Sequence, residues 1–308
     1  MLVSVVTPSL NRGVFIEETI RSVMAQSYLQ IEHIVIDGGS TDGTLDILQR
    51  YKHLTWVSEP DNGAVDAVNK GWRMARGEVV AMLPADDTYT PWAVQCAVDY
   101  LTEYPCVDMV YGDCNVIDAA GRVFRQLNPG EFDLGKLLRS CMIPGPTAFI
   151  RKSVLDKVGL LDTNLKLAND YDLWLRIGLN FQLKYIPRVL ANFRMCPGSS
   201  TPETPQKFER LLYEHLYIYE KFFANQQLPK KIKDSKHRVF GSAYMSLGLH
   251  YHSLRKGAQA RHYLVRALVA DPKLFIKFPW LSIFFTSSLL RAYFITEALV
   301  KCKRRILG

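Results

Sequence analysis

Four short apolar runs, separated by amphipathic stretches, constrain the fold of this chain more than any other feature. The apolar runs cover residues 3–7, 31–36, 54–58 and 79–83. Between them lie stretches with helical periodicity, near 14–26, 43–52 and 63–76. Strands this apolar, alternating with helices, are typical of a parallel sheet that is covered on both faces. The sequence therefore predicts an α/β fold with a mostly parallel, Rossmann-like sheet and helices on both faces.

Polar residues follow directly after each of these apolar runs. The four strand ends carry Thr7-Pro8-Ser9, Asp37, Glu59-Pro60-Asp61 and Asp86-Asp87. In an open α/β sheet, ligands bind outside the carboxyl ends of the strands, where the strand order reverses. Four successive polar strand ends therefore predict a binding site at this edge of the sheet.

The pattern changes from mixed to wholly helical further along the chain. Further strands are expected at 107–127, 146–151 and 181–194, and helices at 167–179, 205–225, 236–255 and 258–270. Asp271-Pro272 ends the last of these helices. We therefore expect an α/β domain over 1–203 and an all-helical C-terminal extension over 204–308.

Charge is distributed unevenly between the two parts. The net charge is +8, yet residues 1–228 carry 22 basic and 27 acidic side chains, whereas residues 229–308 carry 16 basic and 3 acidic ones. A nucleic-acid-binding protein would not usually concentrate its basic excess at one end, so we expect no nucleic acid partner. The basic end favours contact with an anionic surface; a solvated basic helical face is the alternative.

An apolar stretch at 278–300 lies within this basic end. Its longest uncharged run, 278–290, has 13 residues, fewer than the roughly 20 that a spanning helix needs. The stretch is expected to lie in the plane of a membrane interface, with Trp280 and Tyr293 near the headgroups and the basic residues after 300 on anionic lipid. A helix packed on the protein or on a second subunit is the alternative, and the oligomeric state stays open.

The N-terminus and the cysteines point to the cytoplasm. Residues 1–6 lack the basic region and cleavage site of a signal peptide and are expected to form a buried strand. The six cysteines show no CxxC pair and no tight framework, which fits reduced thiols. We therefore expect a cytoplasmic protein at the inner face of the cell membrane.

The pair Asp86-Asp87 and a glycine-rich turn at 36–44 carry the chemistry. Adjacent carboxylates repel each other unless a cation joins them, and Mg²⁺ binds one or two protein carboxylates together with substrate phosphates. A helix N-cap with an acid in its first turn is the alternative for the pair. The turn lacks the GxGxxG fingerprint, which argues against a dehydrogenase, but Asp37 could accept a hydrogen bond from a nucleobase.

Taken together, these motifs resemble those of the family-2 glycosyltransferases of the GT-A fold. The similar stretches are SVVTPSLNR at 4–12, EHIVIDGGSTDGT at 32–44, SEPDNGAVDAVNKG at 58–71, LPADD at 83–87 and NDYDLWLR at 169–176. They occur in the order of the family and cover about residues 3–200. The sequence departs from the family at Asn169, where Glu is common, and at Cys196, where His is often found.

The resemblance implies a role for each matching residue. The nucleoside would be held by Thr7, Pro8, Ser9 and Asn11 from the first loop and by Asp37 and Gly38 from the second. Asp61, Asn69 and Lys70 would approach the ribose and phosphates, and Asp86 the ribose or sugar. Asp87 would bind the metal, and Asp170 would be the general base. Trp174 and Arg176 would shape the acceptor side, unless they serve helix packing and a structural ion pair.

The resemblance also implies an activity, an inverting hexosyl-type transfer. The donor would be a nucleotide-diphosphate sugar, the cofactor Mg²⁺ or Mn²⁺, and the acceptor a glycan or lipid-linked saccharide. A catalytically silent nucleotide-sugar-binding protein and a nucleotidyltransferase are the alternatives. The second would release pyrophosphate, and its usual glycine-rich basic signature is not found in the sequence.

Overall fold

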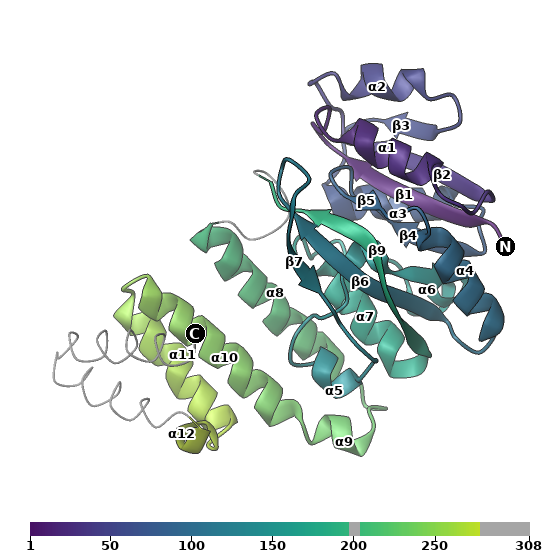
Figure 1. The fold of residues 1–308 in the computed structure, drawn as a ribbon. Coiled ribbons are helices and arrows are strands. Elements are labelled where there is room, and N and C mark those ends of the chain that lie inside the picture. The colour runs from purple at the N-terminus through teal and green to yellow at the C-terminus, as the bar shows by residue number, and fades with distance from the viewer. Residues whose placement is uncertain (197–203, 278–308) are drawn as a thin grey trace. The chain divides into compact units, whose positions relative to one another are not determined.

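A computed structural model of the chain describes residues 1–196 and 204–277 (Figure 1). The chain divides into two compact units, Met1–Glu203 and a second that begins at Thr204. The first unit is mixed α/β, and the described part of the second is wholly helical.

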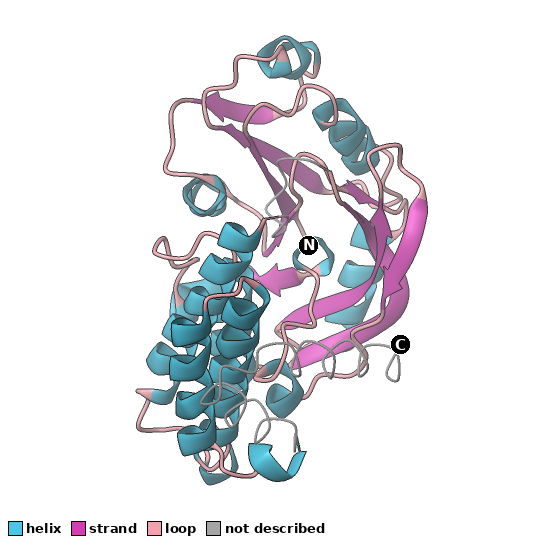
Figure 2. Ribbon diagram, turned by 90° about the vertical axis from the view of Figure 1, so that its left-hand side faces the viewer, coloured by secondary structure: helices cyan, strands magenta, loops and turns pink. Residues whose placement is uncertain are grey.

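Within the described residues, nine strands form one curved sheet (Figure 2). They are β1 (Val3–Ser9), β2 (Ile31–Asp37), β3 (Thr55–Ser58), β4 (Val79–Met82), β5 (Thr88–Tyr89), β6 (Met109–Ile117), β7 (Val123–Leu127), β8 (Phe149–Arg151) and β9 (Leu183–Arg194). Their order is β3-β2-β1-β4-β8-β6-β9-β5, with β7 paired to β6. The first four strands run parallel, as predicted. β8 is antiparallel to β4 and to β6, so the second half of the sheet is mixed.

The helices of the first unit follow the predicted alternation. They are α1 (Ile16–Met24), α2 (Thr44–Arg50), α3 (Ala64–Met74), α4 (Ala93–Glu103), α5 (Leu134–Leu137), a 3₁₀ turn η1 (Gly145–Thr147), α6 (Lys152–Val158) and α7 (Asn169–Asn180). The predicted helices at 14–26, 43–52, 63–76 and 167–179 are confirmed as α1, α2, α3 and α7. The two-residue strand β5 is too short to show a hydrophobic period, and it was not predicted. The seven-residue helix α6 was not predicted either.

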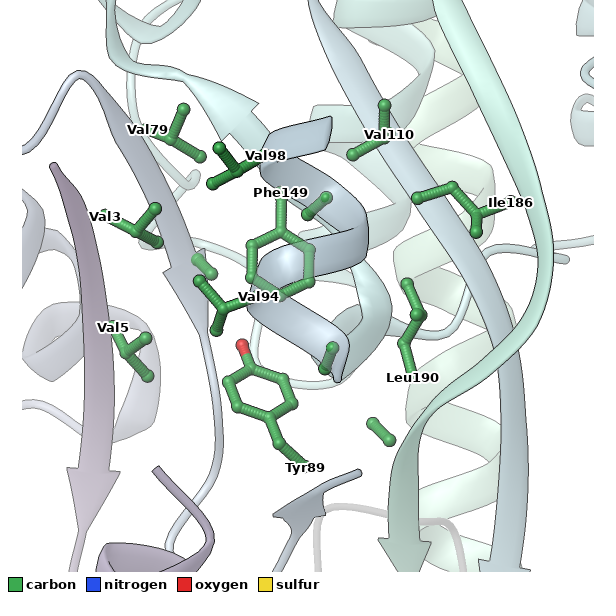
Figure 3. Close-up of a cluster of buried hydrophobic side chains, with 14 of the residues drawn as sticks. Val3, Val5, Val79, Tyr89, Val94, Val98, Val110, Phe149, Ile186 and Leu190 are labelled. Carbon is green, nitrogen blue, oxygen red and sulfur yellow. The ribbon is translucent and has the colours of Figure 1, made fainter. Parts of the chain in front are cut away.

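Helix α4 covers one face of the sheet where its two halves meet (Figure 3). Its Val94 and Val98 belong to a buried cluster with Val3 of β1 and Phe149 of β8. Tyr89 of β5 stacks on Phe149, with ring centroids 5.5 Å apart. Apolar residues at equivalent positions on successive strands thus build one continuous core across the parallel and mixed halves.

Helix α3 covers the opposite face of the sheet. It contacts residues of β1 that alternate with those facing α4, because successive strand residues point to opposite faces. Its Gly71 lies so close to Val6 of β1 that a Cβ atom there would collide with the valine side chain. The close approach brings the start of α3 to the carboxyl end of β1. This helix start forms part of the pocket described below.

The second unit contains α8 (Pro205–Phe223), α9 (Lys230–Lys233), α10 (Lys236–Ser253), α11 (Gly257–Ala270) and α12 (Leu274–Lys277). The hydroxyl of Thr204 caps α8 by accepting a hydrogen bond from the Lys207 N–H, and Pro205 follows at the first helical position. Leu247 of α10 and Leu264 of α11 are fully buried in a shared core, to which α8 also contributes. The predicted helices at 205–225, 236–255 and 258–270 are thus confirmed.

No helix among the described residues has the length and apolar character needed to cross a membrane. The stretch 278–300 and the basic residues after it, for which contact with a membrane interface is predicted, lie outside the described residues.

Candidate active site

A pocket of about 680 Å³ opens at the carboxyl ends of β1 and β4. These strands are neighbours, and β2 and β3 lie on the far side of β1, so the strand order reverses at this point. The walls come from the loop after β1, the start of α3, the turn after β4, the 3₁₀ turn η1 and the start of α7. The pocket therefore lies where an open α/β sheet places its ligand.

Several residues predicted for the site meet in this pocket. Its lining includes Pro8, Ser9, Asn11, Asp61, Asp86, Asp87 and Asp170, from segments up to 162 positions apart. The hydroxyl oxygen of Ser9 is buried without a hydrogen-bond partner among the described residues. Because an unsatisfied buried hydroxyl is costly, this atom is a natural contact for a bound ligand.

The turn that carries Asp86 and Asp87 is held by a buried arginine from β9. Arg194 is 2% exposed, and its Nε donates to the backbone oxygen of Asp86 at 2.9 Å. Its own N–H donates to Asp87 Oδ1 at 2.7 Å. The guanidinium also pairs with Glu18 of α1 at 2.6 Å. One residue of β9 thus fixes which way the two adjacent carboxylates point.

The side chain of Asp87 borders the pocket and is shielded from solvent. The residue is fully buried, and its Oδ2 has no hydrogen-bond partner among the described residues. Burial, and then the charge of Asp86, raise the pKa of the Asp87 carboxyl well above its usual range. Burial raises the pKa of the Tyr89 hydroxyl, and the charge of Asp87 raises it further. Asp87 therefore lies beside the core residue Tyr89, with its carboxylate shielded from solvent.

The side chain of Asp86 is the more accessible of the two. Its Oδ2 lies 3.3 Å from Nε of Arg12, and the two side chains are 12% and 23% exposed, respectively. The thiol of Cys196 donates to the same oxygen at 3.8 Å. Burial, and then the charge of Asp86, raise the pKa of the Cys196 thiol, so the sulfur is a neutral hydrogen-bond donor at neutral pH.

Asp61 and Lys166 form the wall on the α3 side. The Asp61 carboxylate accepts a hydrogen bond from the Gly63 N–H at 2.8 Å, just before α3. The Lys166 ammonium donates to the Asn62 carbonyl at 2.6 Å and reaches across from the loop before α7. An acidic and a basic side chain are thus presented to a ligand at this wall.

Asp170 stands on the first turn of α7 at the other wall. Its Oδ1 accepts a hydrogen bond from the Tyr171 N–H at 2.7 Å, and Gly145 of η1 leaves room beside its Oδ2. Burial raises the pKa of the Asp170 carboxyl to about 6. A carboxylate with a pKa near the operating pH, bordering a pocket, suits general base catalysis.

Three of the predicted nucleoside contacts are absent from the pocket lining. Thr7 is fully buried, and its hydroxyl is hydrogen-bonded to Nε2 of His33 at 2.9 Å. Asp37 is fully buried and accepts hydrogen bonds from the hydroxyls of Ser40 and Ser58. Gly38 lies against Asp61, where a Cβ atom would come within 2.9 Å of Asp61 Oδ2. These residues shape the loops from behind.

Four more predicted site residues are absent from the pocket lining, and each is either buried or paired with other residues. The amide of Asn69 exchanges hydrogen bonds with the Leu161 backbone at 2.9 and 3.0 Å. Lys70 pairs with Glu59. Trp174 is buried at 2% exposure. Arg176 pairs with Asp172 at 2.8 Å and donates to carbonyls at the end of α6, as in the structural alternative for this residue.

Sequence reasoning did not assign a role to Arg12 or Lys166, the two cationic residues of the described pocket lining. Arg12 stands inside the stretch 4–12 that carries the family resemblance, directly after a polar turn, so a signal was present. Lys166 lies in an irregular loop and matches no motif quoted above.

The described residues fit a divalent cation that binds together with a phosphate ligand. Among them, no cluster of three or more His, Cys, Asp and Glu side chains could hold a metal by itself. The described lining carries four aspartates, Asp61, Asp86, Asp87 and Asp170, against the two cations Arg12 and Lys166. A polyanionic ligand would therefore need an added positive charge. Mg²⁺ commonly supplies it while bound to one or two carboxylates.

Comparisons with known proteins agree on one family for this chain. A sequence profile described as "Glycosyl transferase family 2" matches residues 4–159, about half of the chain. An uncharacterised glycosyltransferase of Rickettsia prowazekii (strain Madrid E) is 27% identical over 283 residues, which cover 89% of this chain and 86% of that protein.

Two solved structures share the fold. The crystal structure of S. aureus TarS 1–349 in complex with UDP-GlcNAc has a TM-score of 0.64 at 19% identity and covers 89% of this chain and 91% of that one. The mannosyltransferase PcManGT from Pyrobaculum calidifontis, in complex with GDP-Man and Mn²⁺, has a TM-score of 0.61 at 22% identity. It covers 96% of this chain and 86% of that one. At these identities the likeness is one of fold, of the GT-A type that the sequence predicts.

Proposed function

Because this chain belongs to glycosyl transferase family 2, we propose that it is a glycosyltransferase with an inverting, metal-dependent mechanism. It moves a sugar from a nucleoside diphosphate to a glycan or a lipid-linked saccharide. The observation that carries this proposal is that Asp61, Asp86 and Asp170 line the same pocket as Arg12 and Lys166. In one pocket, a carboxylate can act as the general base, other carboxylates can bind a metal, and cationic side chains can bind a diphosphate.

Inversion is a single in-line displacement at the anomeric carbon. The acceptor hydroxyl oxygen forms a bond to that carbon as the bond from carbon to the diphosphate oxygen breaks. Asp170 takes the proton of the hydroxyl, and its pKa of about 6 leaves it mostly ionised at neutral pH. The nucleoside diphosphate leaves with the bonding electrons, and the new glycosidic bond has inverted stereochemistry.

We assign the metal contact to Asp87, as the resemblance implies. Asp87 lines the pocket, and its buried Oδ2 has no hydrogen-bond partner among the described residues, so this oxygen is available to a cation. When bound, Mg²⁺ or Mn²⁺ would offset the charge of the departing diphosphate. Asp87 Oδ1 is held by the Arg194 N–H, and Asp86, which pairs with Arg12, is assigned to the ribose or sugar of the donor. The solved structure of PcManGT with GDP-Man and Mn²⁺ supports a metal in this fold.

The donor nucleoside is assigned to the side of the pocket formed by β1 and α3. Pro8, Ser9, Asn11 and Asp61 border this side. Asp61 would accept hydrogen bonds from the ribose hydroxyls. Thr7, Asp37 and Gly38 support the same loops from behind. Asn69, Lys70 and Arg176 are assigned structural roles on the strength of their contacts, and Trp174 on the strength of its burial.

We further propose that residues 1–203 form the catalytic domain and that the extension from 204 brings it to the cytoplasmic face of the membrane. The basic excess of residues 229–308 supports the second part, because a lipid-linked acceptor would be made at an anionic surface. The oligomeric state is left open.

A donor screen tests the proposed function. The full chain is incubated with UDP-, GDP- and dTDP-sugars and a saccharide acceptor, with and without Mn²⁺, and released nucleoside diphosphate is measured. We expect release from one nucleotide class, stimulated by Mn²⁺ and abolished in Asp170→Asn. Binding without release would favour the silent binder, and pyrophosphate release from a nucleoside triphosphate and sugar phosphate would favour the nucleotidyltransferase.

A further inference from the structure

Basic side chains are concentrated at one place in the helical unit. Residues 230–238, which form α9 and the start of α10, hold four lysines, one arginine and one histidine against a single acidic residue, Asp234. The four lysines and the arginine are exposed. None of these five side chains is paired with a carboxylate in the part of the chain that the structure describes. Residues 230–238, here called the basic patch, therefore present an uncompensated positive charge to the solvent.

An open depression of about 790 Å³ lies in the basic patch. Its described lining consists of Lys233, Asp234, Lys236, His237, Phe240, Tyr244 and Ala270. The Lys233 ammonium donates to the Gln226 carbonyl at 2.6 Å, and Lys236 Nζ lies 5.9 Å from the centroid of the Phe240 ring. Both ammonium groups are thus held beside the depression by neighbours that carry no negative charge. An anionic group that enters the depression would meet both of them.

Exposed aliphatic side chains lie at the same end of the helical unit. The start of α10 packs beside the segment that follows α11, because a Cβ atom at Gly241 would come within 2.7 Å of the Asp271 side chain and 3.4 Å of Leu274 (Figure 1). Val269, on the last turn of α11, is 78% exposed, and Ile276 of α12 is 82% exposed. Cations and aliphatic side chains on one surface are typical of a protein that lies on a membrane.

We infer that the basic patch, together with Val269 and Ile276, is a docking surface for acidic phospholipid. Lys233 and Lys236 bind a headgroup phosphate at the depression, and the two aliphatic side chains enter the boundary between headgroups and acyl chains. This inference rests on the proposed membrane role of the extension. It assigns that role to α9, the start of α10 and the end of α11, which are separate from the apolar stretch 278–300.

Acidic lipid fits this surface better than a nucleic acid strand does. Proteins that bind single strands combine their cations with aromatic rings on which the bases stack. Here the rings of the depression pack within the unit, since Phe240 contacts Tyr219 and Tyr244 belongs to the helical core. The exposed side chains of Val269 and Ile276 are aliphatic instead. They lose contact with water only where an acyl layer lies beside the phosphates.

The test measures how tightly the full chain binds vesicles of mixed phosphatidylglycerol and phosphatidylcholine, by co-sedimentation. The patch variant is Lys233→Gln/Lys236→Gln, in which a glutamine can still donate to the Gln226 carbonyl. The control variant is Arg255→Gln/Lys256→Gln, which removes the same charge from two exposed residues in the turn between α10 and α11, at the other end of both helices. Thermal melting confirms that each variant is folded.

At low salt, we expect the patch variant to bind these vesicles about 10- to 30-fold more weakly than wild type, because each lysine at an anionic surface contributes about five-fold. The control variant should bind within about two-fold of wild type, since charges farther from the lipid than the screening length of about 10 Å contribute little. Val269→Ser/Ile276→Ser, which leaves the charge unchanged, should weaken binding by at least about five-fold.

Several results would overturn the inference, and they differ in what they leave standing. Wild-type binding by the patch variant, or an equal loss in the control variant, removes this surface while the membrane role of the extension stands. Displacement of the vesicles by inorganic phosphate at the concentration of the lipid phosphate, or equally tight binding of a single-stranded oligonucleotide, assigns the surface to a soluble ligand. A wild-type protein that binds no acidic vesicle overturns the membrane role and the inference together, and the donor screen tests catalysis separately.

Discussion

At the scale of single residues, the pocket depends on the difference between two adjacent aspartates. The sequence predicts a site at this pair, because adjacent carboxylates at a strand end repel each other unless a cation joins them. It does not predict how the two side chains are oriented, because side chains of neighbouring turn residues point apart. Arg194, 107 positions beyond Asp87, determines the orientation. Such a long-range contact leaves no local signal in the sequence.

Asparagine substitutions separate the two aspartates, because Asn keeps the shape and removes the charge. Asp87→Asn should weaken Mn²⁺ binding in the presence of nucleoside diphosphate by more than the roughly 10–100-fold that loss of a supporting contact costs. Asp86→Asn should weaken it by at most that range, since the carboxylate of Asp86 is paired with Arg12 and is not the proposed metal ligand. Isothermal titration of both variants checks this, and the reverse ranking would give the metal to Asp86.

The raised pKa of Asp170 predicts how activity depends on pH. A general base acts when ionised, so kcat/KM should rise with pH through about 6 and level off above it. Because the folded-state pKa is raised, ionisation of this carboxyl opposes folding, and its contribution to stability should fall as pH rises from about 4 to 6. The pH profile of initial rates tests the first statement.

Asp170→Asn should lower kcat by about 10²–10⁴-fold and leave donor affinity within about two-fold of wild type. Nucleotide binding by fluorescence and turnover by nucleoside diphosphate release are measured on the same preparation. Turnover near the wild-type level, or an ascending limb that remains in Asp170→Asn, would remove Asp170 as the base.

At the scale of helices and strands, the order of elements along the chain could be predicted, but the strand pairing in the mixed half of the sheet could not. Each of the first four strands has its own apolar period and a polar end, so the parallel half of the sheet follows from the sequence. The position of β8 between β4 and β6 does not follow from the sequence. Its three residues are too few to indicate which two strands it pairs with or that it pairs with both in antiparallel fashion. The 3₁₀ turn η1, which leaves room for Asp170, depends on that placement.

The close contact of α3 with β1 predicts a cost for any side chain at Gly71. Gly71→Ala should destabilise the protein by about 1–3 kcal/mol, because the added methyl group collides with Val6 in a packed core. The matched control is Gly257→Ala on α11, where an added methyl group would meet no neighbouring atom within 4 Å. It should be neutral or stabilise by up to about 1 kcal/mol. Urea denaturation of both variants checks the pair, and equal midpoints would contradict it.

At the scale of the whole molecule, the sequence pattern predicts where the chain divides into two units, but not which of the predicted site residues line the pocket. The change to a helical pattern near residue 204 coincides with the boundary between the two compact units. Within the first unit, Asn69, Lys70, Trp174 and Arg176 match family motifs, yet none of them lines the pocket. A family motif includes residues that surround a site as well as the site itself, and the sequence alone does not separate the two.

The uneven charge predicts selective binding to acidic membranes. The full chain should sediment with vesicles of phosphatidylglycerol and not with those of phosphatidylcholine, because residues 229–308 carry 16 basic and 3 acidic side chains. Binding should weaken with added salt, since the screening length falls from about 10 Å at 0.1 M to about 3 Å at 1 M. Equal binding to both kinds of vesicle would mean that the basic residues do not contact the lipid headgroups and are exposed to solvent.

The pocket draws one wall from each half of the sheet. The parallel half supplies the loop after β1 and the start of α3, and the mixed half supplies η1 and the first turn of α7. The two walls come from separate segments of the chain, so substitutions in one segment leave the residues of the other unchanged. On the proposed function, the wall that carries Asp170 can diversify in evolution while the wall assigned to the donor stays constant. An engineer seeking a new linkage would for the same reason randomise residues 128–146 and leave the first 90 untouched.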